Sequence, residues 1–167
     1  MRKIGSVPIL SLLVLAGCAS FSGYDLVPGQ ATVADVQATM GKPAAIREQP
    51  GGEKVYWYPR LPFGRQSFAA RIGPDGRLVA IEQRLDTAYI ARIRPNVSTA
   101  EDVLDAIGPP NEVYRYARQQ REVWEYQLRT PPDQSILYVQ MSPDRTVREV
   151  YTLLERDLFN NGFMMFP

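Results

Sequence analysis

Two residue types, histidine and cysteine, limit the catalytic and metal-binding chemistry that this sequence can support. It contains no histidine and a single cysteine, Cys18, among 167 residues. Serine–histidine and cysteine–histidine catalysis, histidine metal sites and intrachain disulfides are therefore excluded by composition. The carboxylates suggest no acid–base pair either, since Glu101 and Asp102 stand where helix capping already accounts for acidic residues. We expect a protein that is not an enzyme and holds no cofactor or metal.

Cys18 remains as the reactive group, and its surroundings indicate covalent lipidation. A positively charged start precedes a mostly apolar run over residues 4–14, which is too short to span a bilayer because that takes roughly 20 residues. The run is typical of a secretory signal peptide. The Leu-Ala-Gly-Cys sequence that follows resembles the lipobox of bacterial lipoproteins, which implies cleavage before Cys18 and acylation of its thiol. We expect a signal peptide over residues 1–17 and a lipidated tether over residues 18–27.

The chain after the tether repeats one unit. The segment PGQATVADVQATMGKP, which begins at Pro28, is matched 67 residues later by PNVSTAEDVLDAIGPP. The same ungapped offset pairs Trp57 with Trp124. An internal period of this size indicates tandem structural repeats. We expect repeat 1 over residues 28–85, repeat 2 over residues 86–155 and a C-terminal tail over residues 156–167.

Each copy opens with the signals of a short capped helix. A threonine followed three residues later by an aspartate has the spacing of an N-cap with an acidic first turn. A glycine then ends the helix. In this order the residues are Thr32, Asp35 and Gly41 in the first copy, and Thr99, Asp102 and Gly108 in the second.

After each helix the pattern changes to segments rich in β-forming residues. Proline–aspartate turns separate the last two segments of each copy, so adjacent strands are expected to be antiparallel. The expected strands cover residues 45–48, 53–58, 66–72 and 77–84, then 113–116, 122–128, 134–141 and 147–152. We expect an α+β fold of two tandem αβ repeats, with three to four strands each, forming one antiparallel sheet with helices on one face.

The capped helix, the glycine–proline stop and the tryptophan strand, behind a lipobox, resemble the BamE/SmpA family of small outer-membrane lipoproteins. The two 16-residue segments quoted above carry the resemblance, together with VYWY and VWEY. It implies a non-catalytic accessory role in the β-barrel assembly machinery, whose subunits would be the partners. The lipid on Cys18 would hold the chain at the periplasmic face of the outer membrane, and Ala19 after it resembles lipoproteins that are sorted there.

The doubled unit also resembles the architecture of the β-lactamase inhibitor protein. That resemblance implies an alternative function, as a periplasmic inhibitor or regulator that holds an envelope enzyme on an open sheet face. Both functions need an exposed binding surface on the sheet.

Alternation along the tryptophan strands suggests where that surface lies. We expect both tryptophans to pack the sheet onto the helices, because such residues bury a large apolar area. The opposite face would then be open, and tyrosine there is a favoured contact residue for partner proteins. An ordinary solvated face is the alternative. The candidate binding residues are Tyr56, Tyr58, Val123 and Glu125.

The charged residues give a weaker indication of the binding partner. The formal net charge is +1, from 19 basic and 18 acidic residues, so no nucleic-acid partner is expected. Arg115, Arg118 and Arg121 form a basic cluster. It would either meet anionic lipid headgroups or an acidic partner, or belong to a solvated hairpin.

Overall fold

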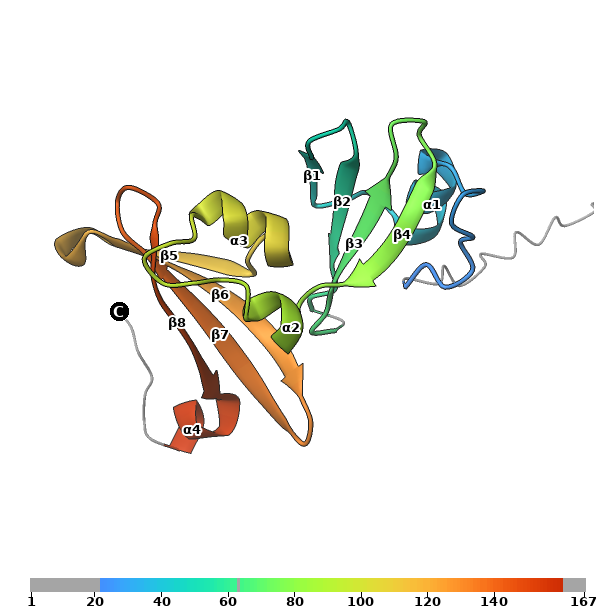
Figure 1. Ribbon diagram of the computed structural model, residues 1–167. Helices are drawn as coiled ribbons and strands as arrows, with labels where there is room; N and C mark the ends of the chain where they lie inside the picture. The colour runs from blue at the N-terminus through green and yellow to red at the C-terminus, as the bar shows by residue number, and fades with distance from the viewer. Residues whose placement is uncertain (1–21, 63, 161–167) are drawn as a thin grey trace, which may run out of the picture.

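The computed structural model describes residues 22–62 and 64–160, so the expected signal peptide and Cys18 lie outside the described residues. Repeat 1 contains α1 (Val33–Met40), β1 (Ala45–Glu48), β2 (Lys54–Pro59), β3 (Ser67–Ile72) and β4 (Leu78–Gln83). Repeat 2 contains α2 (Thr87–Ile90), α3 (Ala100–Ile107), β5 (Glu112–Tyr116), the 3₁₀ turn η1 (Ala117–Gln119), β6 (Arg121–Thr130), β7 (Asp133–Met141) and β8 (Val147–Leu154). Helix α4 (Glu155–Asn160) begins at the last residue of that repeat and extends into the tail. The α+β class is therefore confirmed (Figure 1).

Both expected helix caps are present. The Asp35 carboxylate accepts a hydrogen bond from the Thr32 backbone N–H at 2.8 Å, and the Thr32 hydroxyl accepts one from the Asp35 backbone N–H. Thr99 and Asp102 repeat this capping box at the start of α3. In both repeats the backbone hydrogen bond to threonine lowers the pKa of the aspartate. The sequence spacing thus predicts these helix starts correctly, because a cap depends only on residues in the same turn.

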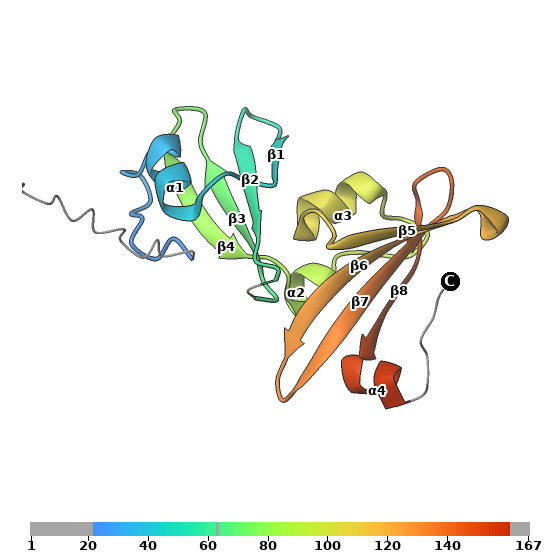
Figure 2. The ribbon, with the colours of Figure 1, turned by 180° about the vertical axis from the view of Figure 1, so that it is seen from behind.

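The expectation of one continuous sheet is wrong. Strands β1-β2-β3-β4 form one antiparallel sheet, called sheet I here, and β5-β6-β7-β8 form a second, called sheet II. The physical reason lies in sheet I, which buries apolar side chains on both faces. One face packs on α1, and the other carries Val55, Trp57 and Ala69, which form a separate buried cluster. The end of α3 lies against this second face, where Gly108 meets the Trp57 ring, and Figure 2 shows α2 and α3 between sheet I and the strands of sheet II.

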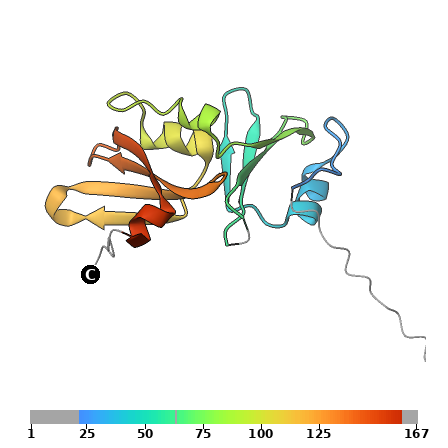
Figure 3. The same cartoon turned by 90° about the horizontal axis from the view of Figure 1, so that it is seen from below.

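The layers therefore run in the order α1, sheet I, α2 with α3, and sheet II. Val103 and Ile107 of α3 pack on sheet II and are fully buried. Figure 1 and the view from below in Figure 3 show α4 at the far ends of β7 and β8, away from α3. The face of sheet II that is turned away from α3 is thus the outermost sheet face of the described chain.

The ungapped match of Trp57 with Trp124 is also wrong. Glu48 pairs with Lys54 across five intervening residues, whereas Arg115 pairs with Glu122 across six. Counted between the equivalent positions Glu48 and Arg115 and their partners, the β5–β6 hairpin therefore contains one residue more than the β1–β2 hairpin. A shift of one residue moves every following side chain of a strand to the opposite face. Trp124 consequently packs on its own helix α3, in the position that Tyr56 occupies in repeat 1.

This one-residue shift explains why the sequence analysis placed Tyr56 and Tyr58 on the wrong face. They pair with Ala70 and Phe68 and belong to the buried cluster beneath α1. Their exposed fractions are 8% and 3%. The expectation that they lie on an open face is wrong, because the one-residue difference between the repeats exchanges the two faces of β2 relative to β6.

Two structurally equivalent tyrosines give a matched test of this packing. The buried Tyr126 hydroxyl donates a hydrogen bond to the Gly108 carbonyl at 3.0 Å, whereas the buried Tyr58 hydroxyl has no partner among the described residues. We expect Tyr126→Phe to lower the free energy of unfolding by about 1–3 kcal/mol, because it leaves a buried carbonyl unpaired. Tyr58→Phe should be neutral or stabilising. Urea unfolding of both variants measures this, and equal losses would contradict the assigned contacts.

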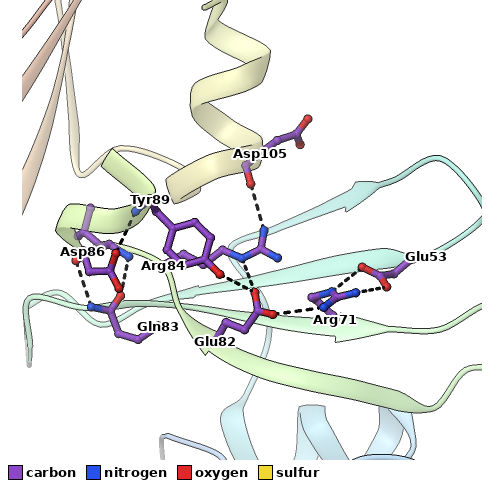
Figure 4. Close-up of polar contacts among 9 residues, drawn as sticks. Glu53, Arg71, Glu82, Gln83, Arg84, Asp86, Tyr89 and Asp105 are labelled. Carbon is purple, nitrogen blue, oxygen red and sulfur yellow. Dashed lines mark hydrogen bonds and ion pairs between the residues drawn. The ribbon is translucent and has the colours of Figure 1, made fainter. Parts of the chain in front are cut away.

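A partly buried polar network joins the repeats (Figure 4). The Arg84 guanidinium donates to the Glu82 carboxylate at 2.7 Å and to the Asp105 backbone carbonyl at 3.1 Å. It also lies between two aromatic rings, 5.6 Å from the Trp57 centroid and 5.4 Å from that of Tyr89. Cation–π contacts of this kind strengthen when they are shielded from water. The network fixes sheet I against α2 and α3.

A second set of contacts connects β1 and the residue after it to α3. Arg47 donates hydrogen bonds to Glu101, at 2.9 Å, and to Asp105. Gln49 donates a third, to Asp105, at 3.0 Å. Because the two repeats share these interactions, sheet II and its outer face are held in a fixed position relative to repeat 1.

Candidate functional site

The outer face of sheet II is the candidate site. Alternation along β6 places Val123 and Glu125 on this face, as expected, but both are buried, with exposed fractions of 7% and 8%. Glu125 pairs in register with Tyr138 on β7, which in turn pairs with Tyr151 on β8. Tyr114 of β5 lies beside Val123. The name "tyrosine face" is used below for Tyr114, Tyr138 and Tyr151 with Glu125 between them.

The tyrosines line the face and remain accessible. Tyr114 is 38% exposed and Tyr151 is 37% exposed. The rings of Tyr138 and Tyr151 lie with their centroids 5.4 Å apart at an interplanar angle of 31°. Gln140 donates a hydrogen bond to the Tyr151 hydroxyl at 3.1 Å. The face therefore combines fixed aromatic rings with polar groups, a composition that suits protein–protein contacts.

Glu125 lies beneath these rings and is held by them. The Tyr114 hydroxyl donates a hydrogen bond to the Glu125 carboxylate at 3.2 Å, and the Tyr138 hydroxyl also interacts with it. Burial raises the pKa of Glu125, and the facing carboxylate of Glu112 raises it further. Burial, followed by the nearby Glu125 charge, likewise raises the pKa values of Tyr114 and Tyr138 to about 12.

The raised pKa predicts a pH-dependent stability. The folded chain keeps the Glu125 proton to higher pH than the unfolded chain does, so the free energy of unfolding falls as pH rises from about 4.5 through the raised value. Glu125→Gln cannot ionise and escapes this loss. We expect the variant to be more stable than the parent at about pH 7 and equal to it at about pH 4, in urea unfolding.

The control for that measurement is Glu48→Gln. Glu48 is an exposed carboxylate paired with Lys54 at the edge of sheet I, and surface ion pairs contribute little to stability. It should change the unfolding free energy little at either pH. A stability difference for Glu125→Gln that is the same at both pH values would contradict the raised pKa.

The predicted basic cluster lies at one end of sheet II, away from Glu125. Arg115 forms an ion pair with Glu122 at 2.9 Å, and Arg121 forms one with Glu149 at 3.5 Å. Arg118 is exposed. A pocket of about 570 Å³ opens there, between the β5–β6 connection and the β7–β8 turn. Because its arginines are largely neutralised within the chain, this pocket is a weaker candidate for an anionic ligand.

Residues 22–62 and 64–160 contain neither a metal-binding cluster nor a membrane-spanning helix. No group of three cysteine, aspartate or glutamate side chains is arranged to hold a metal ion. None of the helices there has the length and apolar character that crossing a membrane requires.

Comparisons with known proteins add little. No protein-family model matches the chain, and no curated protein matches it. Among solved structures, a DUF4309 family protein (YjgB) from Bacillus subtilis is similar at 18% sequence identity, over 79% of this chain and 84% of that one. The TM-score is 0.30. This is a weak structural likeness, and neither fold nor function is transferred from it.

Sequence reasoning found one member of the tyrosine face and missed its aromatic part. Tyr114, Tyr138 and Tyr151 come from three different strands, so no local spacing connects them. The signal that unites them is their alternation in step with Glu125 across sheet II. That signal can be used only once the strand register is known.

Proposed function

We propose that this chain is a non-catalytic binding protein at the periplasmic face of the outer membrane, where it serves as an accessory subunit in the assembly of β-barrel outer-membrane proteins. The observation that carries the binding role is the tyrosine face. Its accessible rings lie on the outermost sheet of the described chain, and tyrosine is enriched where proteins meet. Such a surface binds a partner without performing chemistry on it.

The location and the partner class rest on the sequence. The lipobox-like segment before Cys18 supports lipidation, and multiple acyl chains give stable anchoring where a single chain does not. Anchoring would also raise the effective concentration of the tyrosine face for partners at the same membrane. The likeness of the repeated segment to the BamE/SmpA family supports the barrel-assembly machinery as the partner.

In-cell photocrosslinking tests this proposal. A photoreactive benzoylphenylalanine at Tyr151 would report contacts of the tyrosine face, and the same residue at Ile46, which is 51% exposed on sheet I, would serve as a matched control. We expect barrel-assembly subunits to be captured from Tyr151 and not from Ile46, with a lower yield in a Cys18→Ala form. Mass spectrometry identifies the captured proteins.

The same experiment separates the second candidate function. An open aromatic sheet face also suits the capture of a soluble enzyme. Recovery of one periplasmic enzyme from Tyr151, without assembly subunits, would replace the accessory role by that of an inhibitor or regulator. Equal capture from Tyr151 and Ile46 would contradict a binding role for the tyrosine face.

A further inference from the structure

The charges on the tyrosine face are not balanced within the described chain. Ion pairs reach every described glutamate except two, Glu112 and Glu125. The paired ones are Glu48, Glu53, Glu82, Glu101, Glu122, Glu149 and Glu155. The two exceptions pair in register with each other across β5 and β6, on the tyrosine face.

Facing carboxylates of this kind repel each other. Like charges directly opposite on neighbouring strands destabilise a sheet, and Glu155, although paired with Arg65, adds to the negative potential at Glu125. The nearest arginines on the same side of β6 are Arg121 and Arg129, each four residues from Glu125, which corresponds to about 13 Å along a strand. Arg121 is already engaged by Gln140 and Glu149. Since no ion pair within the described chain engages Glu112 or Glu125, a cation from outside it would relieve the repulsion.

The rings around Glu125 favour the same kind of ligand. The faces of tyrosine rings carry negative potential and attract ammonium and guanidinium groups. Tyr138 and Tyr151 present neighbouring rings, and Tyr114 lies on the other side of Glu125. A basic side chain laid across this face would place its apolar stem on the rings and its charge near the carboxylates.

We propose that the tyrosine face receives a basic side chain, arginine or lysine, of the partner protein, with its cationic group between Glu125 and Glu112. The inference rests on the proposed binding function and specifies the chemistry of the partner surface. Arginine suits the site better than lysine, because its planar guanidinium both stacks on rings and pairs with carboxylates.

A peptide titration tests the inference without knowledge of the partner. The purified full chain is titrated with acetyl-Gly-Arg-Gly-amide, and with the same peptide carrying uncharged citrulline in place of arginine. NMR signals of the tyrosine rings and the Glu125 carboxyl report binding. We expect saturable shifts with the arginine peptide and binding roughly tenfold weaker with citrulline, as the loss of a charge-assisted contact implies.

Two variants make the test specific. Glu125→Gln should weaken arginine-peptide binding roughly tenfold, and the urea experiment above shows whether it remains folded. Glu149→Gln is the matched control. It removes a carboxylate from the same face, but this carboxylate already forms an ion pair with Arg121. Equal effects of the two variants, equal affinity for both peptides, or no saturable binding at millimolar peptide would each overturn the inference.

Two further outcomes separate this inference from the proposed function. Full retention of the partner crosslink from Tyr151 in a Glu125→Gln background would overturn the basic-side-chain inference and leave the binding function standing. Absence of any partner crosslink in the parent would overturn the function, whatever the peptide does. If arginine-peptide binding required deletion of residues 161–167, the chain's own tail would be the occupant, and the inference would be wrong.

Discussion

Replacing Gly108 by alanine is expected to destabilise the chain by about 2–6 kcal/mol. Gly108 ends α3 at φ +83° and ψ −168°. A residue with a side chain is strained in this backbone conformation. A Cβ atom there would also lie 2.8 Å from Cδ2 and Cζ3 of the Trp57 ring, and closer still to Cε3. Trp57 is fully buried, so the ring cannot move aside without disturbing the contact between the two repeats. Urea unfolding at equilibrium measures the loss.

Gly41 provides a matched control for that variant. It ends α1 at φ +86° and ψ −163°, nearly the same conformation, but an added Cβ atom would meet nothing within 4 Å. Gly41→Ala should therefore cost only the backbone strain, about 1–3 kcal/mol. The difference between the two variants, about 1–3 kcal/mol, isolates the overlap with the indole. Equal costs would contradict the packing of Trp57 on Gly108.

Replacing Trp57 by alanine should lower the free energy of unfolding by about 3–5 kcal/mol. The indole belongs to the buried cluster on the second face of sheet I, with Val55 and Ala69. Arg84 also stacks on it, so its removal weakens the polar network as well as the packing. Calorimetry and urea unfolding measure the change.

A double-mutant cycle shows whether the two predictions concern one contact. In a Trp57→Ala background, Gly108→Ala should cost no more than Gly41→Ala does, because the ring that obstructs the new methyl group is gone. The coupling energy should then be about 1–3 kcal/mol. Additive effects would show that Trp57 and Gly108 are not in contact, and the layered arrangement of the repeats would need revision.

The accuracy of the sequence-based predictions depended on how far apart the interacting residues are. Thr32 with Asp35 and Thr99 with Asp102 form their caps as predicted, because each box closes within a single turn. The antiparallel strand order within each repeat follows in the same way from short connections and turn sequences.

The candidate site depended on longer-range information. The reasoning placed Glu125 on the correct face of sheet II but did not predict its burial, which comes from tyrosines on other strands. It placed Tyr56 and Tyr58 on the wrong face of sheet I, because one additional residue between equivalent positions of the β5–β6 hairpin shifts the register between the repeats. An offset of 68 would have aligned Val55 with Val123 and Tyr58 with Tyr126, but the two tryptophans favoured an offset of 67.

The sequence by itself determined the local elements of this protein: the two capped helices, the glycines that end them, and the strands that follow. These depend on contacts within a few residues, where propensity and hydrogen bonding act directly. Only the tertiary structure decided that the strands form two sheets and that the helices of repeat 2 cover sheet I. The reason is that Trp57, Val55 and Ala69 form an apolar surface on a second face of sheet I, which must be buried against some other element. Nothing in the order of the residues states which element that is.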